Sequence, residues 1–139
     1  MKTYMLDTNI CSYIIRKYPD VIRRLEEETQ SGDTKIVISA VAYAELMHGA
    51  ANPRTPKNVL HSIREFVLLV DGIIPLDASD VELSAAIQHE LLKAGEQIGF
   101  NDSLIAAQAI RGKCICVTNN MREFARVPDL MLENLIAHH

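Results

Sequence analysis

Three acidic side chains each lie alone in a long, largely apolar stretch of this chain. They are the only Asp, Glu, Lys or Arg residues in residues 3–15, 36–53 and 97–110, and they are Asp7, Glu45 and Asp102. A carboxylate in low-dielectric surroundings needs a partner cation, several hydrogen-bond donors or a metal ion. Because these stretches contain no Lys or Arg to pair with the acids, we expect the three carboxylates to bind a shared hard cation.

The cation that suits such ligands is Mg²⁺ or Mn²⁺. Both ions accept carboxylate oxygens and retain bound water, whereas zinc prefers His and Cys. The associated chemistry is phosphoryl transfer or phosphodiester hydrolysis, in which the ion lowers the pKa of a bound water and neutralises charge on the phosphate oxygens. One of the carboxylates can also hold the attacking water as a base. We expect four neighbouring side chains to support the ligands by hydrogen bonds: Thr8, Asn9, Ser39 and Thr118.

Taken one at a time, these residues have simpler interpretations. A lone Asp7 is more often a helix N-cap, Glu45 more often belongs to a solvated helix face, and Asp102 is more often another cap. Asn120, the remaining candidate site residue, is more often a turn residue. The metal-site interpretation is favoured only if the fold brings these side chains to one place.

Short apolar runs alternate with amphipathic or Ala-rich segments along the chain. The runs predict strands at residues 4–6, 36–38, 73–76 and 114–118, with a last strand near 130–132. The intervening segments predict helices near residues 10–14, 19–30, 40–49, 60–70, 79–94, 101–111 and 121–124. The strands lack period-two alternation, which is typical of a parallel sheet covered by helices on both faces. The predicted class is therefore α/β with three layers.

Capping residues mark several of the predicted helix ends. Ser79 and Glu82 have the spacing of a capping box, and the pair Asn101–Asp102 is predicted to cap the following helix. Gly95 and the pair Ser31–Gly32 are predicted to end helices. Asp77 is interpreted as a turn or cap residue, because Asp80 and Glu82 follow it closely.

The predicted elements bring the candidate residues to one edge of the sheet. In an open parallel sheet the functional crevice lies beyond the carboxyl ends of the strands. Asp7 directly follows the first strand, and Asn120 follows the fourth. Glu45 lies within the helix after the second strand, and Asp102 lies at the start of the helix that precedes the fourth. We therefore expect all four side chains to reach one site.

Composition limits the remaining possibilities. The 139 residues are enough for one domain over residues 1–139, and their hydrophobic content of 48% is that of a globular protein. The three cysteines are interpreted as small buried hydrophobic residues, and we expect a cytoplasmic protein with neither a secretory leader nor a membrane span. A net charge of −4 argues against nonspecific nucleic-acid binding. Local basic clusters remain available at Arg16, Lys17, Arg23 and Arg24, or at Arg111, Lys113, Arg122 and Arg126.

Four segments of the chain resemble the PIN-domain ribonucleases, and within them the VapC toxins of bacterial toxin–antitoxin pairs. The segments cover nearly the whole chain in the order of that family, and each contains one candidate residue. They are residues 4–10 with Asp7, 38–49 with Glu45, 98–107 with Asp102 and 117–128 with Asn120.

The resemblance implies a parallel five-stranded sheet and a Mg²⁺ or Mn²⁺ site built from Asp7, Glu45 and Asp102. It implies endonucleolytic cleavage of RNA, with tRNA anticodon loops as targets in several members, and growth arrest through inhibited translation. It also implies a homodimer and a cognate antitoxin of the VapB type that blocks the cleft and contacts operator DNA for the pair. The broader family pattern has a fourth acid where this chain has Asn120, which favours one tightly bound ion.

Other functions fit the residues less well. A phospho-accepting receiver domain requires paired acids after the first strand and a lysine after the last strand, and this chain lacks both features. A phosphatase with an Asp nucleophile requires a second Asp at position 9, where this chain has Asn. A PIN-type nuclease that acts in RNA maturation or on DNA would use the same site and is the main alternative. A binding module without catalytic activity is the third possibility.

Overall fold

Five parallel strands form one sheet in the order β3-β2-β1-β4-β5. The computed structural model describes residues 1–30 and 32–134. The strands are β1 (Lys2–Leu6), β2 (Thr34–Ser39), β3 (Gly72–Ile74), β4 (Ile115–Val117) and β5 (Leu132–Glu133). β1 lies at the centre, where Tyr4, Met5 and Leu6 are almost fully buried and pair with both β2 and β4. The predicted parallel α/β fold is therefore confirmed.

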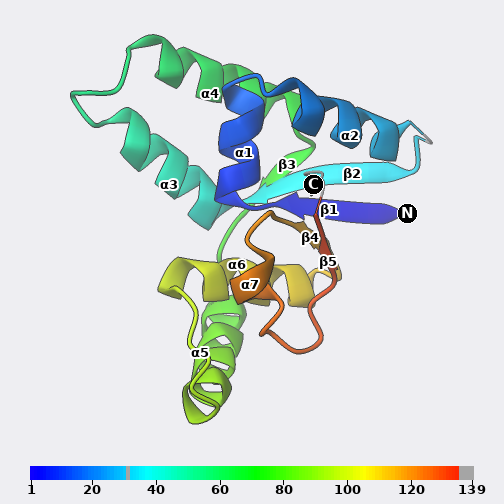
Figure 1. Cartoon of the computed structure of the whole chain (residues 1–139), viewed down its shortest axis with the longest axis vertical. Helices are drawn as coiled ribbons and strands as arrows, with labels where there is room; N and C mark the ends of the chain where they lie inside the picture. The colour runs from blue at the N-terminus through cyan, green and yellow to red at the C-terminus, as the bar shows by residue number, and fades with distance from the viewer. Residues whose placement is uncertain (31, 135–139) are drawn as a thin grey trace.

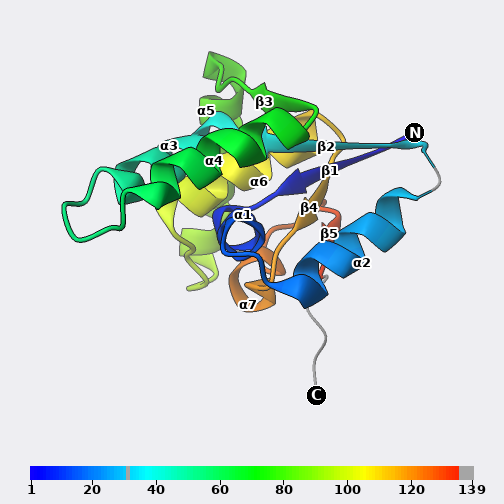
Figure 2. The same cartoon turned by 90° about the horizontal axis from the view of Figure 1, so that it is seen from above.

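Helices cover both faces of this sheet (Figures 1 and 2). Helices α1, α2 and α4 lie on one face, and α5, α6 and α7 lie on the other. Helix α3 follows β2 beyond the edge of the sheet and contacts α1, α4 and α6. The helices are α1 (Thr8–Ile15), α2 (Pro19–Thr29), α3 (Ala40–Ala50), α4 (Asn58–Leu69), α5 (Ala78–Lys93), α6 (Phe100–Arg111) and α7 (Met121–Phe124). Among the described residues, no helix is long and apolar enough to cross a membrane.

Each buried strand contributes side chains to two separate hydrophobic cores. In β1, Tyr4 and Leu6 belong to the core beneath α1, α2 and α4, whereas Met5 belongs to the core against α5 and α6. Alternation between the two faces is a property of strand geometry, and here both faces are apolar. The central strands are continuous apolar runs because both of their faces are buried.

A buried amide joins the carboxyl ends of β2 and β3 to α6. The side chain of Gln108 is almost fully buried and donates hydrogen bonds to the carbonyl oxygens of Ile74 (3.2 Å) and Pro75 (3.0 Å). Its oxygen accepts a hydrogen bond from the Ser39 hydroxyl, which in turn accepts one from the amide of Val41 and caps α3. This polar contact holds the start of α3 and the middle of α6 at the same edge of the sheet.

Three local predictions need correction. The capping box of α5 is formed by Asp77 and Asp80 rather than by Ser79 and Glu82, because Asp80 accepts the Asp77 amide as a Glu would. Helix α6 begins after Gly99, so Asp102 lies in its first turn and is not its cap. The third strand ends at Ile74 because Pro75 has no N–H to donate to a neighbouring strand.

Other predicted features are confirmed. Gly32 and Gly95 follow α2 and α5 with positive φ, as expected of residues that end helices; Ser31, predicted to act with Gly32, lies outside the described residues. The three cysteines, Cys11, Cys114 and Cys116, are buried and unpaired.

Candidate active site

Asp7 joins the central strand to the first helix and is almost fully buried, with 4% of its surface exposed. Its Oδ1 atom accepts a hydrogen bond from the amide of Ile10 (2.9 Å), so Asp7 is the N-cap of α1. Its Oδ2 atom accepts a hydrogen bond from the Thr118 hydroxyl (2.5 Å) at the end of β4. Burial raises the pKa of Asp7 even though both hydrogen bonds favour the ionised form. Asp7 is therefore a helix cap and also a buried carboxylate, which the sequence analysis predicted to be a metal ligand.

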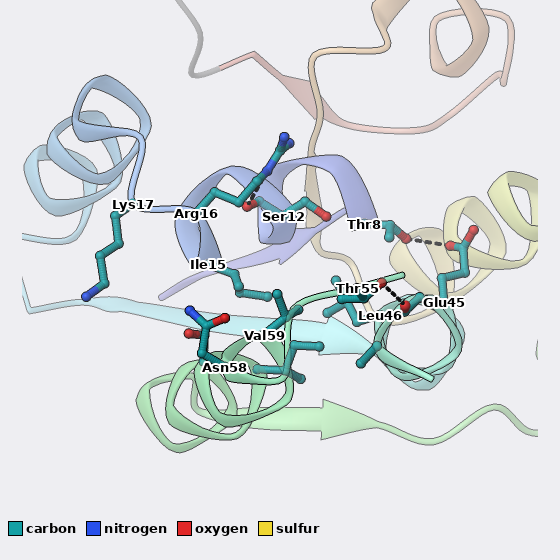
Figure 3. A pocket seen from close by; sticks show the side chains of 14 residues that line it. Thr8, Ser12, Ile15, Arg16, Lys17, Glu45, Leu46, Thr55, Asn58 and Val59 are labelled. Carbon is teal, nitrogen blue, oxygen red and sulfur yellow. Dashed lines mark hydrogen bonds between the residues drawn. The ribbon is translucent and has the colours of Figure 1, made fainter. Parts of the chain in front are cut away.

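Glu45 extends from the second turn of α3 towards the start of α1. Its Oε1 atom accepts a hydrogen bond from the Thr8 hydroxyl at 2.5 Å (Figure 3). Because Thr8 follows Asp7 directly, this bond places the Glu45 carboxylate beside the carboxyl end of β1. The negative charge of Glu45 contributes to the raised pKa of Asp7. The structure therefore brings the first two predicted acids together.

Asp102 lies in the first turn of α6 and is half-buried. Its pKa is raised to about 6, first by burial and then by the charges of Glu123, Asp7 and Glu45. The contribution of these charges requires that Glu123, Asp7 and Glu45 each lie close enough to Asp102 to repel its ionised form. Asp102 is therefore part of the same acidic cluster as Asp7 and Glu45.

Glu123 is the member of this cluster that the sequence analysis missed. It lies on the short helix α7, and its Oε2 atom accepts a hydrogen bond from the side-chain amide of Asn120 (2.6 Å). The predicted fourth position, Asn120, thus carries no charge itself but holds an acid one turn further along the chain. Its backbone amide also donates to the Thr118 hydroxyl (2.8 Å). The sequence contains no signal for Glu123, because the neighbouring Arg122 and Arg126 make it look like a residue of a solvated surface.

The four predicted supporting residues differ in their positions. Thr8 and Thr118 donate hydrogen bonds to Glu45 and Asp7, so they orient two of the acids. Ser39 instead donates to Gln108 and caps α3. Asn9 is exposed, and its side chain makes no hydrogen bond with a described residue. Of these four residues, only the two threonines hold members of the acidic cluster.

No Lys or Arg of the described residues forms an ion pair with Asp7, Glu45, Asp102 or Glu123. In the side-chain positions of this structure, no three His, Cys, Asp or Glu residues of that part of the chain are arranged around a common point as metal ligands. The donor set nevertheless fits a hard divalent cation, because all four groups are carboxylates. Burial raises the pKa of Asp102, and repulsion by Glu123, Asp7 and Glu45 raises it further. A bound cation would remove that repulsion.

The fold and the acidic cluster agree with a match to a known family. The family model for the PIN domain matches residues 4–130. The chain therefore belongs to the PIN domain family, and the match includes every element that contributes an acid to the cluster.

Relatives and solved structures place the chain within the VapC group of that family. Ribonuclease VapC2 of Rickettsia felis is 38% identical over 131 residues, which are 94% of this chain and 96% of the relative. The tRNA(fMet)-specific endonuclease VapC of Shigella flexneri is 37% identical over 134 residues, which are 96% of this chain and 98% of the relative. The predicted resemblance to VapC proteins is thus confirmed.

Two solved structures show how similar the fold is. VapBC2 from Rickettsia felis, bound to a DNA fragment from its promoter, superposes with a TM-score of 0.85 at 37% identity and covers 95% of this chain and 98% of that chain. DNA-bound VapBC from Salmonella typhimurium superposes with a TM-score of 0.85 at 30% identity and covers 98% of this chain and 100% of that chain.

Proposed function

We propose that this chain is the toxin of a toxin–antitoxin pair and that it hydrolyses phosphodiester bonds of RNA with the help of Mg²⁺ or Mn²⁺. The observation that carries the proposal is the cluster of four acids without basic partners at the carboxyl edge of the sheet, where Asp102 has a pKa of about 6. The names of the relatives support RNA as the substrate and tRNA as the substrate class. Cleavage of tRNA would inhibit translation in the cytoplasm.

Asp7, Glu45 and Asp102 would hold the cation, and Glu123 would supply the fourth negative charge that Asn120 lacks. When bound, the ion supplies a water of lowered pKa and neutralises charge that develops on the phosphate. Thr118 fixes the orientation of the Asp7 carboxylate, and Thr8 fixes that of Glu45. One carboxylate of the cluster holds the attacking water and accepts its proton.

The partner that we propose is an antitoxin of the VapB type. Solved relatives are VapBC complexes bound to DNA, which supports both an antitoxin and contact with operator DNA through it. The toxin itself has a net charge of −4, so a strong DNA contact of its own is not expected. A basic side chain of the antitoxin that entered the acidic cluster would compensate the charges of the four carboxylates. We also propose that the toxin forms a homodimer.

The test of the nuclease function is the substitution Asp7→Asn. Asn is as good an N-cap as Asp, because its single side-chain oxygen can accept from the Ile10 amide. Its NH₂ group can then donate to the Thr118 hydroxyl in place of the hydrogen bond that Asp7 accepts, so the fold should be preserved while the charge is lost. We expect the wild-type protein to cleave purified initiator tRNA with Mg²⁺ or Mn²⁺ and not with EDTA, and the variant to lose at least about 100-fold in rate, on the order of a lost catalytic group.

Asp77→Asn is the matched control, because Asp77 is also an N-cap but lies outside the acidic cluster. It should cleave at the wild-type rate. Equal cleavage by wild type and Asp7→Asn would refute the assigned site, and cleavage of a DNA of the same sequence at the same rate would assign the activity to another nuclease class.

A further inference from the structure

A cavity of about 550 Å³ extends from the acidic cluster along α1. Its volume is within the range of small-molecule and nucleotide sites. Thr8 and Glu45 line the end next to the acids, and Lys17 lines the opposite end (Figure 3). Between them the wall includes apolar side chains from α1, α3 and α4, such as Ile15, Leu46 and Val59.

Arg16 lines the same cavity and is fixed by two aromatic rings. Its guanidinium carbon lies 5.3 Å from the ring centroid of Tyr13 and 5.0 Å from that of Tyr18. Its Nε atom donates to the carbonyl oxygen of Ser12 (3.3 Å). No acid among the described residues forms an ion pair with Arg16 or with Lys17. Two positive charges are thus available at the end of α1, where Arg16 points away from the other lining side chains and is held in a defined orientation (Figure 3).

The aromatic pair is linked to the acidic cluster on its other side. The rings of Tyr13 and Tyr18 lie 4.9 Å apart, and the hydroxyl of Tyr13 accepts a hydrogen bond from the side chain of Asn119 (3.1 Å). Asn119 stands between Thr118 and Asn120, which contact Asp7 and Glu123. Since a helix rises about 1.5 Å per residue, Tyr13 lies about 9 Å along α1 from Asp7.

Lys17 occupies a backbone position that favours glycine. Helix α1 ends in a Schellman motif, in which the amide of Tyr18 donates to Tyr13 and that of Lys17 donates to Ile14. Lys17 has a φ of 61°, so a lysine is used at a position where it is strained. The Tyr13–Tyr18 contact is the apolar contact that usually accompanies this motif. The motif therefore explains why two aromatic residues are present at these positions, but it does not explain why a lysine is present at position 17.

We propose that the end of α1 is a nucleotide-binding subsite for the RNA strand next to the cleaved phosphate. Arg16 and Lys17 bind backbone phosphate, and the exposed ring of Tyr18 together with the Arg16 guanidinium provides a stacking surface for an unpaired base. The inference rests on the proposed nuclease function and names the segment that holds the substrate. Phosphate contacts from Arg and Lys combined with stacking on aromatic rings are the usual means of holding single-stranded nucleic acid.

The chain contains a matched pair of variants for the test. Helix α6 ends in the same motif, where Lys113 has a φ of 54° and its amide donates to Ile110 while that of Cys114 donates to Ala109. Lys113 precedes β4 and therefore lies at the edge of the sheet opposite the acids. Lys17→Gly and Lys113→Gly each remove one positive charge and relieve one positive φ, so neither should lower the melting temperature.

The experiment measures cleavage of purified initiator tRNA with Mg²⁺ and, separately, tRNA binding in the Asp7→Asn background over a range of salt concentrations. Lys17→Gly and Arg16→Gln should each lower kcat/KM about 5-fold or more through KM, and each should reduce the salt slope of binding by about 0.7 to 0.9. Lys113→Gly should change neither. Tyr18→Leu should weaken binding about 5-fold or more, whereas Tyr18→Phe should keep it.

Equal effects of Lys17→Gly and Lys113→Gly on kcat/KM and on the salt slope would overturn the subsite. The subsite is also refuted if the Lys17 and Arg16 variants lose antitoxin binding but cleave and bind tRNA normally, since the surface would then belong to a protein partner. A wild-type protein that fails to cleave any RNA refutes the nuclease function itself, and the binding measurements then decide whether the surface still takes RNA.

Discussion

Replacing Asp102 by Asn should stabilise the metal-free protein at neutral pH. The pKa of Asp102 is raised from 3.8 to about 6 in the folded protein, so the folded state favours the protonated, neutral form. Above pH 6 the ionised carboxylate therefore lowers the free energy of unfolding. As the pH falls from about 6 to 3.8 the folded protein takes up the proton and this destabilisation disappears. An amide resembles the neutral form at every pH.

The magnitude follows from the difference between the two pKa values. It corresponds to about 3 kcal/mol if the carboxylate were fully shielded from solvent. Because Asp102 is only half-buried, solvent screening reduces the expected gain to about 1–2 kcal/mol at pH 7.5. Asp20→Asn, on the surface of α2, serves as the control and should change the stability by less than about 0.5 kcal/mol.

Urea denaturation in EDTA at pH 7.5 and at pH 4.5 measures this gain. We expect the free energy of unfolding of Asp102→Asn to be larger than that of the wild type at pH 7.5 and to approach the wild-type value at pH 4.5. Adding Mg²⁺ at ten times its dissociation constant should then stabilise the wild type by about 1.4 kcal/mol and the variant much less. A variant that is no more stable than the wild type in EDTA would show that neither burial nor the neighbouring acids raise the pKa of Asp102, and would remove this support for a cation site.

Two other predictions concern the pH dependence of cleavage and the buried amide. The rate of cleavage at a fixed low Mg²⁺ concentration should rise as the pH increases through about 6, because deprotonated Asp102 binds the cation. The midpoint of this rise should move to lower pH at a higher Mg²⁺ concentration. A cleavage rate that does not change from pH 5 to pH 8 would contradict this prediction. Gln108→Leu should lower the free energy of unfolding by about 2–4 kcal/mol in urea titrations, because it leaves the Ile74 and Pro75 carbonyl oxygens and the Ser39 hydroxyl without their buried partner; a loss below about 1 kcal/mol would show that water replaces the amide.

The strands and the fold class could be predicted because they depend on apolar burial. The run at residues 4–6 and the pair Val37–Ile38 are buried on both faces, and such apolar runs predict a covered parallel sheet without any knowledge of tertiary contacts. Helix ends were less predictable, because short polar side chains can replace one another as caps. Asp80 performs in α5 the role that a capping-box Glu usually has, so the start of that helix was placed too late.

Residues of the candidate site could be predicted only where an acid is the sole charged residue in a long stretch of the chain. Asp7, Glu45 and Asp102 meet this condition, and the structure places all three in one cluster. Glu123 does not, because Arg122 precedes it and Arg126 follows it closely, and such a residue normally belongs to a solvated surface. The cavity beside α1 could not be predicted either, because its shape depends on how α3 and α4 pack against α1.

The hydrogen bond between Thr118 and Asp7 joins residues that are 111 positions apart in the chain. The carboxylate that follows the first strand is capped locally by the Ile10 amide, but it acquires its second hydrogen bond only after the fourth strand has been synthesised and has added to the sheet beside the first. A nascent chain on the ribosome contains Asp7, Glu45 and Asp102 before it contains the threonine that orients Asp7. The enzyme would consequently remain inert towards the RNA of the ribosome that makes it until translation of its own message is almost finished.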